Sequence, residues 1–187
     1  MKFPIHTERL RLRYWEERDL PYLIELNQDK DVMEYFLHPL TASESHTFYQ
    51  RMQQHLLEHQ FSLSVVEHIA TGEWMGYAGC MQANFEAAFT PCVEIGWKFH
   101  KKWWGNGYAT EAAKAWLHYA FAELSIPRIY SFTSIHNIRS EAVMKRIGMQ
   151  KTGEFNHPKV PANHHLNLHV IYAINKVQFE ESNNISN

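Results

Sequence analysis

The chain has 187 residues, a length typical of one domain, and we expect a single domain over residues 1–187. Apolar residues make up 45% of it and aromatic residues 14%, which is enough for a sizeable core and excludes a disordered chain. The formal net charge is -2 and no long basic run occurs, which excludes bulk electrostatic attraction to nucleic acid.

Targeting and membrane signals are not evident. The opening stretch MKFPIHTERLRLRYW lacks the apolar segment of a signal peptide, and no run approaches the roughly 18 apolar residues of a membrane span. The two cysteines, Cys80 and Cys92, favour a reduced compartment over a disulfide. We therefore expect a cytoplasmic protein with no membrane or nucleic-acid partner, and a polar tail, 181–187, that frays.

The first predicted element is a half-buried strand in TERLRLRYW, followed by a helix over 20–28 that Asp19 is placed to cap. Two kinds of side chain alternate between the faces of this strand: Leu10, Leu12 and Tyr14 on one, and Arg9, Arg11 and Arg13 on the other.

A second helix is expected within residues 41–60, with Ser43 as its cap. Its apolar face carries residues at spacings of four: Phe48, Met52 and Leu56. The segments FSLSVVEH and WMGYAGCM predict two strands of a hairpin, joined by a turn around Gly72.

The second half alternates strands and helices. CVEIGWKFH predicts a strand, and from 109 to 124 apolar residues recur at spacings of three and four, which predicts an amphipathic helix of four turns. RIYSFTSIH is the next strand, followed by a helix that Asn137 caps and Gly148 ends, and by a last strand in LHVIYAINK. This order predicts an α+β fold in which residues 92–131 form a parallel strand–helix–strand unit.

The turn WGNGYAT lies between that strand and that helix. Gly105 and Gly107 permit a sharp turn and leave the backbone N–H groups uncovered, and a helix N-terminus attracts anions. These features favour a phosphate site to which Thr110 could add a hydroxyl, although a plain tight turn has the same residues. No Gly-Lys-Ser/Thr follows, and Thr110 replaces the third glycine of the dinucleotide fingerprint, so neither of those motifs is present.

The stretch VEIGWKFHKKWWGNGYATEAAKAWLHYAF, with NIRSEAVMKRIGM one strand later, resembles the GNAT superfamily of acetyl-CoA-dependent N-acetyltransferases. The earlier TERLRLR is similar to the branch that includes ribosomal-protein-alanine acetyltransferases. The likeness spans residues 7–175, with the elements in the family's order. It implies a mixed central sheet flanked by helices, whose parallel core binds acetyl-CoA.

The resemblance also implies cofactor contacts. The family's pyrophosphate loop, Gln/Arg-x-x-Gly-x-Gly/Ala, aligns with Trp104, Gly105, Asn106, Gly107, Tyr108 and Ala109. Trp104 departs from Gln/Arg, which weakens the assignment little because the loop binds phosphates mostly through backbone N–H groups. The strand backbone at Trp97, Lys98 and Phe99 would bond the pantetheine arm, and Asn137 would contact its side, unless Asn137 is a helix cap alone.

An amine must be neutral to attack a thioester, so a base is expected near the donor. Glu94 is the candidate base because it interrupts an apolar strand just before the loop; alternatively it is a surface carboxylate paired with a lysine such as Lys98. Many family members place a tyrosine acid where this chain has Met144, which cannot donate a proton. Ser140 is the nearest donor in the motif, with an ordinary first-turn serine as the alternative, and water could also carry the proton.

Other reactive or aromatic residues have simpler interpretations. The histidines of NHPKVPANHHLNLHV (His157, His164, His165 and His169) show no HExxH spacing and no nearby cysteine, so we expect a substrate-facing loop and no metal site. Cys92 has no evident activating partner, which argues against a covalent intermediate. Trp116 is expected in the core, whereas Trp103 and Trp104 could either pack or cover the cofactor.

The predicted activity is direct transfer of an acetyl group from acetyl-CoA to a primary amine, on either a small molecule or a protein or peptide N-terminus. A non-catalytic acyl-CoA-binding sensor or scaffold is the alternative, motivated by Met144. A metal-binding interaction protein built on the histidines is a third. A homodimer is compatible with the resemblance, and the loops 36–46 and 155–167 would shape the acceptor pocket.

Overall fold

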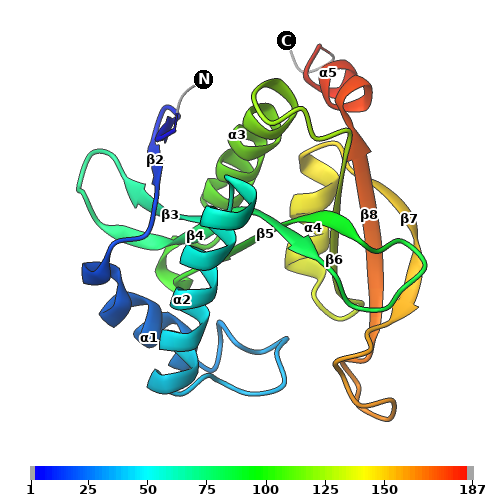
Figure 1. Cartoon of the computed structure of the whole chain (residues 1–187), viewed down its shortest axis with the longest axis horizontal. Helices are drawn as coiled ribbons and strands as arrows, with labels where there is room; N and C mark the ends of the chain where they lie inside the picture. Colours follow the sequence, from blue (N-terminus) through cyan, green and yellow to red (C-terminus); the bar gives the residue numbers. More distant parts are fainter. Residues whose placement is uncertain (1–2, 185–187) are drawn as a thin grey trace.

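The computed structural model describes residues 3–184, and side chains as far as residue 182. Within this range the strands are β1 (Ile5–His6), β2 (Leu10–Arg13), β3 (Leu63–His68), β4 (Trp74–Ala83), β5 (Cys92–Phe99), β6 (Arg128–Ser134), β7 (Gln150–Asn156) and β8 (Leu168–Asn175). They form one eight-stranded sheet in the order β1-β2-β3-β4-β5-β6-β8-β7 (Figure 1). All neighbours are antiparallel except β5 and β6, which confirms the predicted parallel unit.

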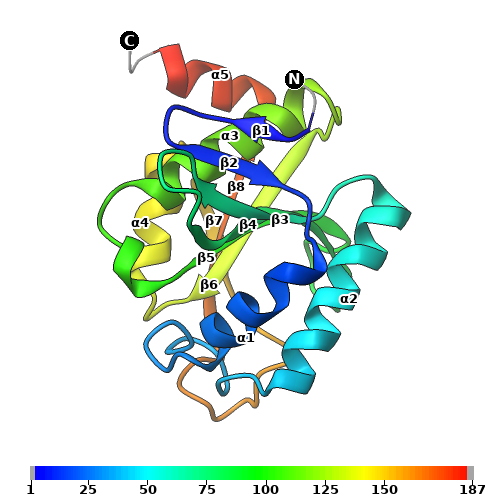
Figure 2. The same cartoon turned by 90° about the vertical axis from the view of Figure 1, so that its left-hand side faces the viewer.

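Helices lie on both faces of the sheet. They are α1 (Leu20–Gln28), α2 (Ala42–His59), α3 (Tyr108–Ala122), α4 (Ile138–Arg146) and α5 (Lys176–Asn184), with short 3-10 turns η1 (Glu17–Asp19) and η2 (Lys101–Trp103). α1 and α2 pack on one face, and α3, α4 and α5 on the other (Figure 2). The predicted α+β class, a mixed central sheet flanked by helices, is confirmed. No helix within the described residues combines the length and apolar character needed to span a membrane.

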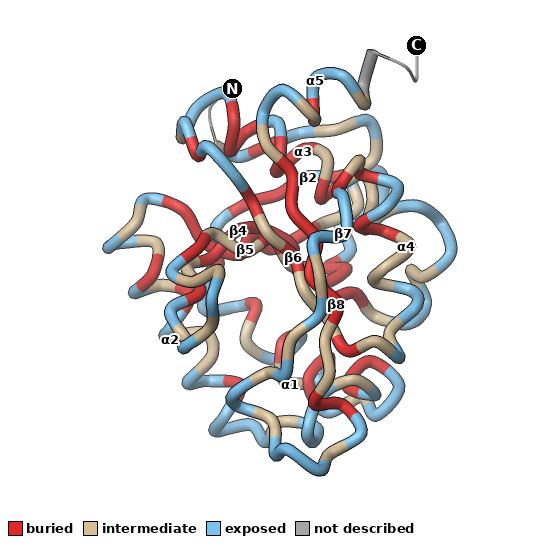
Figure 3. Tube along the Cα trace, turned by 90° about the vertical axis from the view of Figure 1, so that its right-hand side faces the viewer, coloured by how far each residue is buried: buried red, intermediate tan, exposed pale blue. Residues whose placement is uncertain are grey.

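The core is concentrated in the central strands and in α3, where buried backbone runs through the middle of the molecule (Figure 3). The predicted apolar stripe of α3 faces the sheet, and Trp116 at its centre is only 1% exposed. Its indole Nε1 donates to Ser64 Oγ at 2.9 Å, so the polar end of this large side chain is satisfied. Burial of such a side chain stabilises the fold by about 1.5–3 kcal/mol, and this packing fixes α3 against β4 and β5.

Helix limits agree well with the sequence, but two caps differ. Asp19 precedes α1 as predicted, yet its side chain makes no capping hydrogen bond to the helix. Thr41, and not Ser43, caps α2: Thr41 Oγ1 accepts from the Glu44 backbone at 3.2 Å, and Glu44 accepts in return from the Thr41 backbone. This reciprocal capping box satisfies two free N–H groups, which Ser43 inside the first turn cannot do.

The alternation predicted for the first strand is wrong at its end. Arg13 is 5% exposed and forms a two-bond pair with Asp19, each N–O distance being 2.7 Å, whereas Tyr14 is 43% exposed. Glu67 adds a further ion pair to Arg13 at 2.6 Å. The Arg13 charge can be buried because Asp19 and Glu67 pair with it inside the protein. An alternation of polar and apolar residues does not reveal such partners.

Three elements were not predicted. β1 is very short, and β7 (sequence QKTGEFN) is a largely exposed edge strand that lacks an apolar alternation. β7 pairs with one edge of β8, and the other edge of β8 pairs with β6. α5 extends to Asn184, so the first residues of the tail 181–187 lie in a helix, and 185–187 lie outside the described residues.

Candidate active site

The turn before α3 presents a row of free backbone donors. Gly105 and Gly107 adopt φ values of +80° and +81°, the left-handed region that glycine enters without strain. Within the described residues, the backbone N–H groups of residues 105–110 donate to no acceptor. They come together at the N-terminus of a 15-residue helix, where the helix dipole adds positive potential. Residues 105–110 of the predicted loop therefore form a row of free donors suited to phosphate oxygens, whereas the Trp104 N–H donates to the Lys101 carbonyl at 3.1 Å.

An ion pair with the N-terminal region holds this turn in place. Arg9 Nε donates to Glu111 Oε2 at 2.7 Å, and Thr7 Oγ1 donates to Glu111 Oε1 at 2.6 Å. Arg9 also donates to the Asn106 carbonyl at 3.0 Å and lies 4.4 Å above the Tyr108 ring. Although partial burial acts to raise the pKa of Glu111, these hydrogen bonds outweigh it and keep that pKa below its usual value. Sequence reasoning interpreted TERLRLR as a strand and as part of the family resemblance, and missed this role.

The parallel strands β5 and β6 separate beside the turn. They pair only at Val93 with Ile129 and at Glu94 with Tyr130, after which β6 continues alongside β8. Figure 1 shows the two strands diverging from that point. The β6-facing edge of β5 from Ile95 to Phe99 is thus left without a strand partner, which is the requirement for an extended chain to add there. Trp97 and Phe99 direct their backbone groups to this edge, whereas Lys98 pairs with Tyr77 and directs its backbone groups to β4.

The two tryptophans near the turn pack against protein groups. Trp104 Nε1 donates to the Phe99 carbonyl at 2.9 Å, and Trp103 stacks on His68 with ring centres 5.7 Å apart. The Arg139 guanidinium lies 4.5 Å above the Trp104 ring and pairs with Glu34 at 2.6 Å. The segment after α1 therefore meets α4 over Trp104, at one end of the gap between β5 and β6.

Glu94 is half-buried on the sheet face covered by α1 and α2, and no hydrogen bond or ion pair to it occurs within residues 3–184. Burial raises its pKa to about 8, an effect that the positive charges of Arg51 and Lys159 partly oppose. A carboxyl group with this pKa exchanges its proton near neutral pH, as a general base must.

Lys98 is not the partner of Glu94, so the alternative of a surface ion pair is wrong. Its side chain is buried, and Nζ donates to Asn27 Oδ1 at 3.2 Å and approaches Met33 Sδ at 3.0 Å. Burial lowers the pKa of Lys98 to about 7. Its backbone groups face Tyr77 of β4, so neither its side chain nor its backbone is free for the predicted cofactor contact.

Three residues that the sequence analysis singled out lie in α4 or at its N-terminus. Asn137 is a true cap: its Oδ1 accepts from the Ser140 backbone at 3.2 Å, and its Nδ2 donates to Thr133 Oγ1 at 3.0 Å. The Ser140 hydroxyl is half-buried and has no hydrogen-bond partner among the described side chains and backbone, so it is free to donate. Met144 is 1% exposed in the core, which removes this position from any reacting group.

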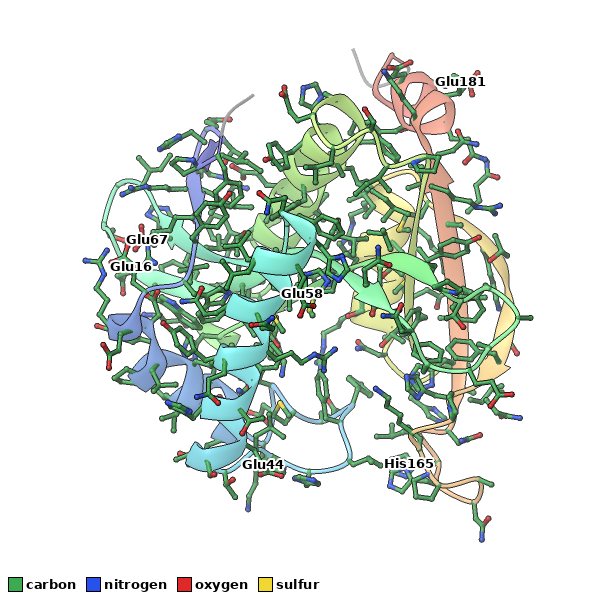
Figure 4. All side chains as sticks on the ribbon, in the orientation of Figure 1. Glu16, Glu44, Glu58, Glu67, His165 and Glu181 are labelled. Carbon is green, nitrogen blue, oxygen red and sulfur yellow. The ribbon has the colours of Figure 1, made fainter. Side chains whose placement is uncertain are left out.

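The histidine segment forms the loop between β7 and β8 and the start of β8. His157 and His169 lie with ring centres 5.0 Å apart, and burial lowers the pKa of both, to about 4 for His157. Figure 4 shows His165 on the outer part of this loop, away from Glu58 of α2. No group of three or more histidine, cysteine or acidic side chains that could hold a metal occurs in the part of the chain that the structure describes.

The geometry so far is a phosphate-binding turn, an open strand edge and a carboxyl group of raised pKa. Residues 9–150 match the family model for the acetyltransferase (GNAT) domain. The chain belongs to the GNAT family. This GNAT protein is 34% identical over 149 residues to "Uncharacterized protein YkkB" of Bacillus subtilis, covering 79% of this chain and 86% of that protein. It is 30% identical over 157 residues to "Uncharacterized N-acetyltransferase YnaD" of the same organism, covering 81% and 85%.

The GNAT fold is also seen in solved structures. Spermidine N-acetyltransferase from Vibrio cholerae, in complex with CoA and spermine, superposes with a TM-score of 0.75, covering 93% of this GNAT chain and 99% of that chain. Its sequence identity of 20% extends the likeness to the fold alone. The predicted GNAT membership and sheet architecture are thus confirmed.

Proposed function

We propose that this protein transfers an acetyl group from acetyl-CoA to a primary amine. The observation that carries the proposal is the row of free N–H groups at 105–110, which suits a pyrophosphate. The open edge of β5 suits the pantetheine amides, and its direction leads from the turn back toward Glu94. CoA bound in the spermidine N-acetyltransferase neighbour supports the same ligand class here.

The chain's own residues supply orientation and proton transfer. Bound acetyl-CoA would contribute a thioester carbonyl as the electrophile. Glu94, directly or through a water, would accept the proton that the amine loses as its nitrogen bonds to the carbonyl carbon. As the carbon–sulfur bond breaks, the Ser140 hydroxyl or water would return a proton to the thiolate. Trp97, Phe99 and residues 105–110 would hold the donor so that the amine meets it at attacking distance.

The test separates binding from chemistry. Calorimetry with acetyl-CoA and free-thiol release with a panel of amines and short peptides should both be positive for the wild-type protein. Glu94→Gln should keep acetyl-CoA affinity while losing about 100-fold or more in turnover. Loss of acetyl-CoA binding itself in the wild-type protein would refute the proposal.

A second function rests on Met144. This buried methionine stands where many family members have a tyrosine acid, so the position supplies no proton donor. A non-catalytic acyl-CoA-binding module would bind acetyl-CoA, release no thiol with any amine, and be indifferent to Glu94→Gln.

For the transferase, Ser140→Ala distinguishes the two possible proton donors. A fall in turnover implicates the hydroxyl, whereas unchanged turnover leaves water as the donor.

A further inference from the structure

A polar hollow lies next to Glu94. Its volume is about 400 Å³, and its walls come from the second half of α2, the end of β4 and the loop between β7 and β8. Met81 lines it and pairs with Glu94 across β4 and β5, so the two side chains are neighbours on one sheet face. An amine bound in this hollow would therefore lie beside the proposed base.

Two cations from distant parts of the chain line this hollow. Arg51 belongs to α2 and Lys159 to the loop between β7 and β8, and neither side chain has an ion pair or hydrogen bond within residues 3–184. Both side chains are exposed, and several other exposed cations are paired with acidic groups, as Lys102 is with Glu73 at 2.8 Å. Two free cations that converge on one hollow indicate an anionic partner that is not part of the chain.

The acidic groups near the hollow offset only part of the charge of Arg51 and Lys159. Glu58 accepts from Gln54 at 2.6 Å and lies 3.9 Å from His59, and Figure 4 shows it on the side of α2 toward β5. Glu94 is largely protonated at neutral pH because burial raises its pKa to about 8. Burial also lowers the pKa of His55, so that this histidine adds no charge. The hollow thus has a positive balance.

We infer that the acceptor is an amine bearing a carboxylate on a nearby carbon, as a free amino acid does. Arg51 and Lys159 would bind the carboxylate while the amine faces Glu94; the inference rests on the proposed function. Both cations line the hollow that Met81 joins to Glu94, so a carboxylate on the amine-bearing carbon would face them while the amine faces Glu94. The same charges would repel a polyamine.

The experiment compares each of the twenty amino acids with its decarboxylated amine, together with spermidine and short peptides. At least one amino acid should be acetylated with a kcat/KM about tenfold or more above that of its amine. Arg51→Gln and Lys159→Gln should each raise the KM for that amino acid about tenfold with kcat little changed. Arg146→Gln, which removes an exposed cation at the end of α4, is the matched control and should alter neither value.

Binding gives a readout that does not need turnover. Calorimetry with the CoA-saturated protein should show the amino acid binding more tightly than its amine, and the difference should shrink in both variants. Preference for spermidine, for a decarboxylated amine or for a peptide, or equal binding of acid and amine, would overturn the inference. If amino acids bind selectively but no thiol is released, the carboxylate site stands and the proposed transfer fails.

Discussion

Arg9 and Glu111, which are 102 positions apart in the sequence, form a two-point ion pair at 2.6 and 2.7 Å beside the glycine turn that precedes α3. The same arginine donates to the Asn106 carbonyl inside the turn. The Asn106 carbonyl is thereby tied to the N-terminal region, while the backbone N–H groups of 105–110 have no acceptor within the described residues. The N-terminal strand thereby fixes the shape of a loop that begins nearly a hundred residues later.

Removal of this pair should weaken cofactor binding more than catalysis. Glu111→Gln and Arg9→Gln should each raise the Kd for acetyl-CoA by about 3–30-fold, because hydrogen bonds to charged groups contribute roughly 1.5–3 kcal/mol and only part of that positions the turn. Turnover at saturating acetyl-CoA should change little. Arg11→Gln, on the exposed side of the same strand, is the control, and an equal loss there would mean that general charge is responsible.

The two glycines of the turn should tolerate no other ordinary residue. A Cβ would fit at both positions: on Gly105 it would have no neighbour within 4 Å, and on Gly107 it would lie 3.6 Å from Arg9. The positive φ values, however, cost any residue with a Cβ about 1–2 kcal/mol of folding free energy. Alanine at either position should lower stability and weaken acetyl-CoA binding, as melting curves and calorimetry would show.

Gly72→Ala separates these two effects. Gly72 has φ +69° and equally open space, but it lies in the hairpin turn between β3 and β4. It should lose similar stability with acetyl-CoA affinity unchanged; matching losses of affinity at all three glycines would contradict a specific role for the turn.

Glu94 should control the pH dependence of both rate and stability. If it is the base, kcat/KM rises with pH up to about 8 in addition to the rise caused by deprotonation of the amine itself, and Glu94→Gln removes the part due to Glu94. For stability the sign is opposite: the folded protein retains a proton that the unfolded chain has lost, so burial of Glu94 lowers stability progressively between about pH 4.5 and 8. At pH 8 the melting temperature of Glu94→Gln should exceed that of the wild type by a few °C; a lower value would indicate an undetected partner for the carboxylate.

Lys98 should have the opposite effect on the pH dependence of stability. Its pKa falls from 10.5 to about 7 on burial, so between these values the unfolded chain binds more protons and stability rises with pH. Lys98→Met should flatten this rise, measured as the change in melting temperature between pH 7 and pH 9. The exposed Lys30→Met is the control, and an unchanged slope in Lys98→Met would show that another group titrates there.

The buried pair of Arg13 and Asp19 should be necessary as a pair. Asp19→Asn leaves Arg13, 5% exposed, with one carboxylate fewer and should cost about 3–5 kcal/mol in the free energy of unfolding. Replacement of both by apolar residues of similar size should cost less than the single change. Denaturant unfolding compares the two, and a double variant that is worse than Asp19→Asn would contradict this account.

The chain order, most helix limits and the cofactor turn could be predicted because each depends on local signals. The stripe around Trp116, the cap at Asn137 and the left-handed glycines follow from periodicity and backbone geometry within a few residues. β7 could not be predicted, since it is a polar edge strand, and its strand partner in the described part of the chain, β8, follows a loop of more than ten residues.

The sequence by itself determined the α+β order, the position of the glycine turn before α3 and the GNAT motif, because spacing and residue type decide these locally. Only the tertiary structure decided the partners of charged groups. Arg13 is buried against Asp19, Lys98 turns away from Glu94, Arg9 clamps Glu111, and Arg51 and Lys159 converge from distant segments. Charge pairing and desolvation depend on distances in space between residues far apart in the chain, and no local pattern encodes those distances.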